Sequence, residues 1–183
     1  MTKLNIGDVM PDFSYQTPFG TGFTLAETAQ KAPRTLLLFL RYYGCPLCQY
    51  DIHQVQVHYK ELTAGGGQIL VVLQSDPAAL AARLGTADAL PFPIICDPDQ
   101  ALYKEFAIAP AANMLKMADA KTIVKIVKAT AAGYQHGAYE GNEQQLPAVF
   151  VMDENRKLTY IHYGKSAGDI PSVAEMKSLL KGC

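Results

Sequence analysis

The strongest constraint on the fold is a run of apolar residues that does not alternate with polar ones, TLLLFL at residues 35–40. A strand covered on one face alternates, whereas a strand covered on both faces reads as continuously apolar. A second run of this kind, QILVVLQSD at residues 68–76, follows a stretch whose apolar residues recur at helical spacing. The order of strand, helix and strand predicts a central parallel sheet that is buried on both faces.

The remainder of the chain predicts further strands around this centre. Residues 13–25 carry the turn residues of a short hairpin, and residues 92–99 form a third, shorter strand. A strand at residues 147–153 and its partner LTYIHYG at residues 158–164 predict a late antiparallel hairpin. The fold class is therefore α/β, with a central mixed sheet flanked by helices and an N-terminal hairpin, in a single domain over residues 1–183.

A long helical region is expected at residues 111–132. Four of its apolar residues are expected in the core: Met114, Met117, Ile123 and Val127. The same region carries a basic stretch, which is either a solvated helix face or a binding surface. Its lysines are Lys116, Lys121, Lys125 and Lys128.

The composition excludes several classes of function. With 49% hydrophobic residues the chain has enough apolar surface for a sizeable core, and a net charge of −1 gives no clustered basic surface for a nucleic acid. The N-terminal residues have no apolar signal segment, and TLLLFL is too short to span a bilayer. We therefore expect a cytoplasmic protein without a nucleic-acid or membrane partner, in a compartment where structural disulfides are rare.

The sequence GCPLC places Cys45 and Cys48 directly after the first buried strand and at the start of a helix. Unpaired N–H groups and the helix dipole stabilise a thiolate at that point, so the pKa of Cys45 should fall. Pro46 fits the first helical position. Cys48 lies one turn later on the same face, within reach of a disulfide. The pair predicts a redox site in which Cys45 attacks and Cys48 resolves.

Two other interpretations of the pair stay open. Two cysteines in an apolar setting also occur as buried structural thiols. A zinc site normally needs four ligands, and the sequence offers neither a second CxxC nor a His-x-His pair. His53 and His58 are five positions apart, which is poor spacing for one helix face. We expect no metal and no organic cofactor.

The other cysteines and one loop complete the candidate residues. Cys96 ends a predicted strand, as a buried inert thiol or a second resolving cysteine, and Cys183 at the C-terminus is a further resolving candidate. A glycine-rich loop before Pro147 either borders the active site or only connects two elements. It contains Tyr134, His136 and Tyr139.

The chain resembles the alkyl hydroperoxide reductase/thiol-specific antioxidant (peroxiredoxin-like) superfamily along nearly its whole length. The resemblance rests on three segments in the family's order: LNIGDVMPDFSYQTPFGTGFTLAE, PIICDPDQALYKEFAI and PAVFVMDENRKLTYIHYG. It implies a thioredoxin-like fold and a thiol oxidoreductase with a redox-active cysteine. It also implies a substrate face near Pro147, where thioredoxin-type folds carry a cis-proline; a cis bond is favoured here over an ordinary trans proline at a strand start.

The active-site motif departs from that of peroxidases in the superfamily. In the pattern PxxxTxxC, Leu38 stands at the Pro position and Tyr42 at the Thr position, and no Arg precedes the last hairpin. Tyr42 offers a hydroxyl and Arg41 a charge. Neighbouring residues on a strand point to opposite faces, so only one of these two should reach Cys45.

A closer resemblance is to the CxxC-bearing branch that includes the prostamide/prostaglandin F synthases. The matching segments are Arg41–Cys48 (RYYGCPLC) and GDIP at residues 168–171. The resemblance implies that the pair reduces a peroxide or a disulfide, with Gly44 shaping the turn before the helix. A thioredoxin-like protein or a low-molecular-weight thiol would recycle it, and a homodimer is compatible with the family. The alternative is a redox-sensing interaction module with negligible turnover.

Overall fold

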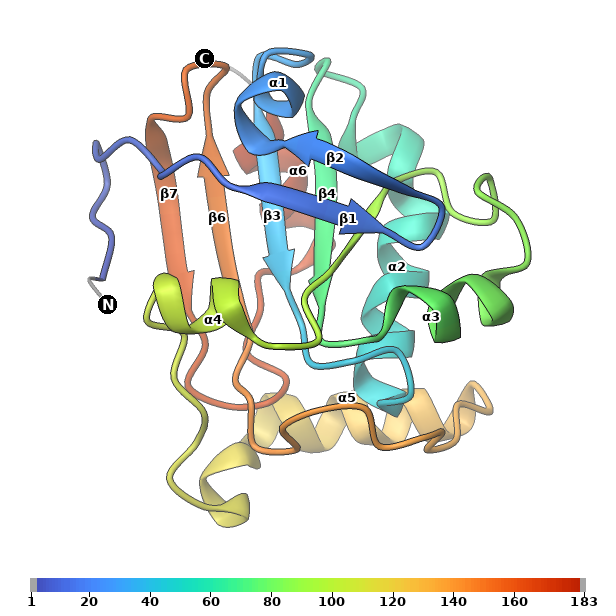
Figure 1. The fold of residues 1–183 in the computed structure, drawn as a ribbon. Coiled ribbons are helices and arrows are strands. Elements are labelled where there is room, and N and C mark those ends of the chain that lie inside the picture. Colours follow the sequence, from blue (N-terminus) through green and yellow to red (C-terminus); the bar gives the residue numbers. More distant parts are fainter. Residues whose placement is uncertain (1–2, 182–183) are drawn as a thin grey trace.

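The computed structural model describes residues 3–181, whose central element is a five-stranded mixed sheet (Figure 1). Its strand order is β5 (Ile94–Cys96), β4 (Gln68–Leu73), β3 (Thr35–Phe39), β6 (Ala148–Met152) and β7 (Leu158–Tyr163). The first three are parallel to one another, and β6 and β7 are antiparallel to their neighbours. The predicted α/β class with buried central strands and a late hairpin is confirmed.

Alternate side chains of β3 enter two separate cores, because successive residues of a strand point to opposite faces. Leu36 and Leu38 pack toward α2 (Pro46–Leu62) and α6 (Val173–Leu180). Leu37 and Phe39 pack toward the other face. The elements over that face are the predicted hairpin, β1 (Ser14–Thr17) with β2 (Gly20–Thr24), and two short helices, α1 (Leu25–Ala29) and α4 (Ala101–Glu105) (Figure 1).

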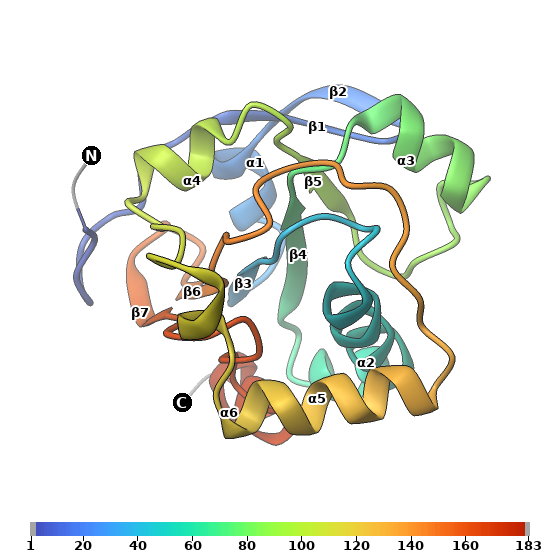
Figure 2. The ribbon, with the colours of Figure 1, turned by 90° about the horizontal axis from the view of Figure 1, so that it is seen from below.

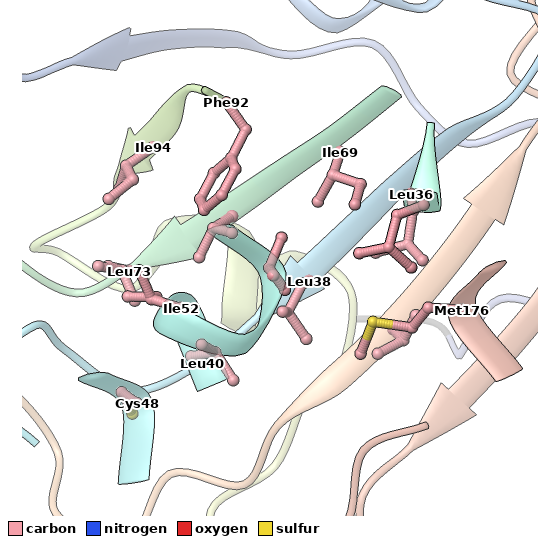
Figure 3. Packing of buried hydrophobic residues seen from close by; sticks show 14 of the residues in the cluster. Leu36, Leu38, Leu40, Cys48, Ile52, Ile69, Leu73, Phe92, Ile94 and Met176 are labelled. Carbon is pink, nitrogen blue, oxygen red and sulfur yellow. The ribbon is translucent and has the colours of Figure 1, made fainter. Parts of the chain in front are cut away.

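The core between the sheet and α2 fixes the position of the cysteine pair. Figure 3 shows Ile52 of α2 beside Leu38 and Leu40, with Met176 of α6 at the other end of the cluster. Cys48 belongs to this cluster and is 4% exposed. The first turn of α2 is therefore held against the carboxyl end of β3 by apolar packing.

The region after β5 differs from the prediction. It forms η1 (Met114–Met117) and α5 (Ala120–Ala131), and α3 (Pro77–Leu84) lies earlier in the chain. Of the four residues expected in the core, only Met117 is buried, and Met114, Ile123 and Val127 are each more than half exposed. Ile123 and Val127 are exposed because α5 crosses below α2 at the rim of the molecule instead of covering the sheet (Figure 2), so it buries only Thr122 and Ala129. Met114 lies outside α5, at the start of η1. None of the helices between residues 3 and 181 has the length and apolarity needed to cross a membrane.

Candidate active site

Cys45 is the N-cap of α2, as predicted from its place between a buried strand and a helix. Pro46 occupies the first helical turn, where the missing N–H costs no hydrogen bond. The Cys45 Sγ accepts a hydrogen bond from the backbone N–H of Cys48 at 3.4 Å. The sulphur therefore takes the place of the side-chain oxygen that normally caps a helix, and a negative charge on it is favoured by the helix dipole.

Arg41 reaches the same sulphur from the segment between β3 and α2. Its Nη2 donates to Cys45 Sγ at 2.9 Å, and its Nη1 donates to the backbone oxygen of Glu143 at 2.6 Å. The guanidinium is thus fixed at both ends of its fork. The sequence has no arginine just before the last hairpin, where peroxidases of the superfamily that it resembles carry one. Here Arg41, four residues before Cys45, brings the positive charge to the cysteine.

The pKa of the Cys45 thiol is lowered from its usual range to about 6 by Cys48 and Arg41 together. The largest cause is a hydrogen bond from the Cys48 thiol, and the charge of Arg41 adds to it, while burial acts in the opposite direction. Burial and the neighbouring Cys45 charge raise the pKa of Cys48 well above the usual value. The two thiols are therefore unequal, with Cys45 ionised at neutral pH and Cys48 protonated.

Cys96 is a buried cysteine of a different kind. Burial, with added repulsion from Asp76 and Glu140, raises the pKa of its thiol to about 12. A thiol that stays protonated is a poor nucleophile, so the interpretation of Cys96 as an inert thiol is favoured. Cys183 lies outside the described residues.

A loop at residues 133–146, the covering loop, lies over the start of α2. The Gly137 N–H donates to the Gly44 oxygen at 2.8 Å. A Cβ on Gly44 would lie 2.3 Å from the Ala138 oxygen, closer than any real contact. Gly44 is thus required by the close approach of another backbone segment, not by a left-handed φ. Of the two interpretations left open for this loop, these contacts agree with the one in which it borders the cysteine pair.

The Tyr42 hydroxyl bonds to residues of the covering loop, and within residues 3–181 it forms no hydrogen bond with the Cys45 thiol. The hydroxyl donates to the Glu143 carboxylate and lies 3.1 Å from His136 Nε2. His136 in turn stacks on the ring of Tyr139, with centroids 4.1 Å apart. The expectation that only one of Arg41 and Tyr42 reaches Cys45 is confirmed, and the residue that does so is Arg41.

The covering loop closes the site in this conformation. Further contacts hold it: Gln49 Nε2 donates to the Gln135 oxygen at 3.1 Å, and Glu140 pairs with Arg83 at 3.2 Å. Cys45 has an exposed fraction of 0%. A reactant therefore meets the sulphur only when this loop moves.

Pro147 follows a trans peptide bond, and no peptide bond within residues 3–181 is cis. The expectation of a cis bond is wrong. The Pro147 oxygen accepts from the Gly164 N–H at 2.8 Å. Gly164 has no room for a Cβ against Pro147, so the proline is set by close packing between β6 and the segment after β7.

The structure adds a buried ion pair that the sequence pattern did not reveal. Asp51, one turn after Cys48, pairs with Lys125 of α5 at 2.9 Å. Burial raises the pKa of Asp51 to about 6, against the lowering effect of Lys125, and the Cys45 charge raises it further. The two residues are far apart in the chain, so only the packing of α5 on α2 brings them together.

His53 lies against the Tyr134 ring, and His58 contacts Glu61 on the surface.

Comparison with protein families gives one match. The model of the AhpC/TSA family matches residues 6–161. No curated protein matches the sequence.

Comparison with solved structures gives the same fold at low sequence identity. Peroxidoxin BcpB from Mycobacterium tuberculosis is 14% identical, with a TM-score of 0.65 over 96% of this chain and 93% of that chain. Peroxiredoxin 6 of Arenicola marina is 14% identical, with a TM-score of 0.69 over 97% and 72%. The 2-Cys peroxiredoxin of Plasmodium vivax is 13% identical, with a TM-score of 0.67 over 96% and 79%. The predicted thioredoxin-like fold is confirmed, whereas the prostaglandin-synthase branch stays a prediction.

Proposed function

The chain belongs to the AhpC/TSA family, and from that premise we propose that it reduces a peroxide through Cys45 and Cys48. The family makes it a thiol-dependent oxidoreductase of the peroxiredoxin-like superfamily. The observation that carries the proposal is the hydrogen bond from Arg41 Nη2 to Cys45 Sγ at 2.9 Å, on a sulphur that already caps a helix. A thiolate prepared in this way is the nucleophile that peroxide reduction needs.

In the proposed first step, the Cys45 thiolate attacks one oxygen of the peroxide. An S–O bond forms as the O–O bond breaks, Cys45 becomes a sulfenic acid, and the leaving oxygen takes up a proton to give an alcohol or water. Arg41 supplies positive charge beside the oxygens as negative charge develops on them.

In the second step, Cys48 attacks the Cys45 sulphur. A disulfide forms and the sulfenic oxygen leaves as water. The high pKa of Cys48 keeps this thiol protonated until then. A thioredoxin-like protein or a low-molecular-weight thiol then reduces the disulfide and restores both thiols. The reductant and a homodimeric assembly are parts of the proposal.

A peroxide suits the site better than a protein disulfide. Cys45 is 0% exposed and Cys48 is 4% exposed, beneath a loop held by the contacts described above. A small peroxide needs only a local opening of the covering loop, whereas a protein disulfide must bring its own backbone to the sulphur. Reduction of a small or flexible disulfide is the second candidate reaction.

Four residues near the pair are proposed as supporting residues. Pro46 starts the helix, and Gly44 leaves space for the covering loop. Tyr42 is proposed to hold that loop through Glu143 instead of contacting the substrate. Pro147 is proposed to shape the substrate face, in a trans conformation.

A coupled turnover assay tests the proposal. Hydrogen peroxide, cumene hydroperoxide and a small disulfide are each supplied with thioredoxin and its reductase. The Cys45→Ser variant should show no turnover. Cys48→Ser should stop after one equivalent, with Cys45 trapped as a sulfenate by a peroxide or as a mixed disulfide by the small disulfide. The matched control is Cys96→Ser, which should turn over like the wild type. If the wild type consumes none of these substrates while the pair still cycles between thiol and disulfide, the redox-sensing module is the correct interpretation.

A further inference from the structure

A groove of about 570 Å³ lies between α2, α5, α6 and the segment before α6. Neither Gly44 nor the covering loop lines it. Figure 2 shows α5 running across this side of the molecule, with α2 and α6 behind it. Apolar side chains form its walls: Val55 from α2, Val124 from α5, Ile170, and Met176 from α6. A volume between about 300 and 1,000 Å³ is typical of small-molecule sites, and the proposed peroxidase reaction makes no use of this groove.

One wall of the groove is a stripe of lysines. Lys121, Lys125 and Lys128 recur at spacings of four and three, which places them on one side of α5, and all three line the groove. The helix is held to the protein by Thr122 and Ala129. Three of the four lysines of the basic stretch therefore line the groove, and Lys116 does not.

The three lysines differ in their partners. Lys125 is engaged at the floor, where it pairs with the buried Asp51 at 2.9 Å. Lys121 is 3.6 Å from Asp169 and its side chain is 69% exposed, so its charge is only weakly neutralised. Within residues 3–181, Lys128 forms no ion pair. Lys128 therefore brings an unpaired positive charge to the mouth of the groove.

The acidic groups that line the groove are already engaged. Asp51 is matched by Lys125, and the Glu175 carboxylate accepts hydrogen bonds from the Ser172 backbone N–H and hydroxyl, both at 2.7 Å. Those bonds also complete the capping box of α6. These hydrogen bonds leave the charge of Glu175 in place, and that charge acts on Lys121. Among the lysines that line the groove, Lys128 is the one without an ion pair in residues 3–181.

We propose that this groove binds a single-chain amphiphile with a carboxylate head, such as a medium-chain fatty acid. The hydrocarbon chain lies on Val124, Ile170 and Val173, which line the groove and keep part of their apolar surface exposed, so that surface is buried when the chain binds. The carboxylate meets Lys128 at the mouth and matches its charge. A short polar anion would leave the apolar walls exposed to water. A neutral hydrocarbon would leave the lysine charge without a partner.

The test is calorimetric titration of the full-length protein with dodecanoate, kept below its micelle-forming concentration. We expect saturable binding of one dodecanoate per chain, about tenfold weaker in Lys128→Gln because one charge-assisted hydrogen bond is lost. Lys116→Gln, which removes a lysine outside the groove, should bind like the wild type. Val124→Glu should abolish binding. Its control is Val57→Glu, because Val57 is 56% exposed and Val124 55%, and only Val124 lines the groove.

Three results would overturn the proposal. The first is the absence of saturable dodecanoate binding. The second is equally tight binding of dodecyltrimethylammonium, which has the same chain and the opposite charge. The third is binding to phosphatidylglycerol vesicles without binding of free dodecanoate, which would make α5 a membrane-contacting surface. Dodecanoate binding does not require Cys45, so it can also be measured in Cys45→Ser, in which peroxide turnover is expected to be lost. The two proposals can therefore fail independently.

Discussion

Replacement of Arg41 by methionine tests how the Cys45 thiolate is stabilised, because methionine keeps much of the apolar stem and removes the charge. A hydrogen bond to a charged group is worth about 1.5–3 kcal/mol. Two unit charges about 4 Å apart at an effective dielectric of about 20 interact by about 4 kcal/mol, an upper bound here because water enters when the guanidinium is removed. The acid dissociation constant of Cys45 should therefore fall by about 10- to 100-fold.

The expected change is large in a direct measurement. With a pKa of about 6, Cys45 in the wild type is mostly thiolate at neutral pH. In Arg41→Met the thiolate fraction at neutral pH should fall to between about one half and one tenth. The assay is the ultraviolet absorbance of the thiolate as a function of pH, with the curve of the matching Cys45→Ser protein subtracted. Arg34→Met is the control, because Arg34 donates no hydrogen bond to either thiol.

A second variant ranks the two causes. The Cys48 thiol is the largest contributor to the low pKa of Cys45. Cys48→Ala should therefore raise that pKa at least as far as Arg41→Met does. An unchanged titration curve in Arg41→Met would refute the role given to Arg41. A shift in Arg41→Met alone, with none in Cys48→Ala, would refute the ranking.

Three further predictions concern stability and access. Lys125→Met leaves Asp51 buried without its partner, so urea denaturation at neutral pH should show an unfolding free energy lower by about 3–5 kcal/mol. The pKa of Asp51, already about 6, should rise further in this variant. Acidification should therefore recover part of the lost stability. Gly44→Ala displaces the Ala138 oxygen, so Cys45 should react faster with iodoacetamide, whereas Gly65→Ala, whose added Cβ has ordinary contacts, should not change the rate. Because the folded-state pKa of Cys45 is depressed, its stabilising contribution is complete above the unfolded-state pKa and is lost as pH falls through about 6. The difference in unfolding free energy between the reduced wild type and Cys45→Ser should follow the same course. A difference that does not change with pH would contradict this prediction.

The strands and the cysteine pair could be predicted because local rules determine them. Thr35–Phe39 is apolar at nearly every position, and a strand between two covered faces must be. Pro46 after Cys45 marks the helix start by its missing N–H. The helix of residues 46–62 then places Cys48 beside Cys45 by spacing alone.

The remaining features depend on contacts between distant segments. Strand alternation predicted that only one of Arg41 and Tyr42 reaches Cys45, but both residues follow the end of β3 at Phe39, so that rule does not explain the outcome. Arg41 is held by the Glu143 oxygen, 102 positions further along the chain. Ile123 and Val127 have the apolar character of core residues, and nothing local shows that α5 lies at the rim. Sequence spacing likewise contains no sign that Asp51 meets Lys125.

Contacts between distant segments also explain the error at Pro147. A proline at a strand start is compatible with either isomer, and its isomer is decided by the surrounding packing. Here Gly164 packs closely against Pro147 and donates to its oxygen, and the peptide bond is trans.

The most direct test of the proposed mechanism is to map the first oxidation product. Fully reduced protein receives one equivalent of hydrogen peroxide, is quenched with an alkylating reagent, and is digested for peptide mass analysis. The mechanism predicts one disulfide, between Cys45 and Cys48, and a sulfenic acid at Cys45 in Cys48→Ser. A first disulfide that joins Cys96 or Cys183, or a Cys45 that remains a thiol, would contradict it.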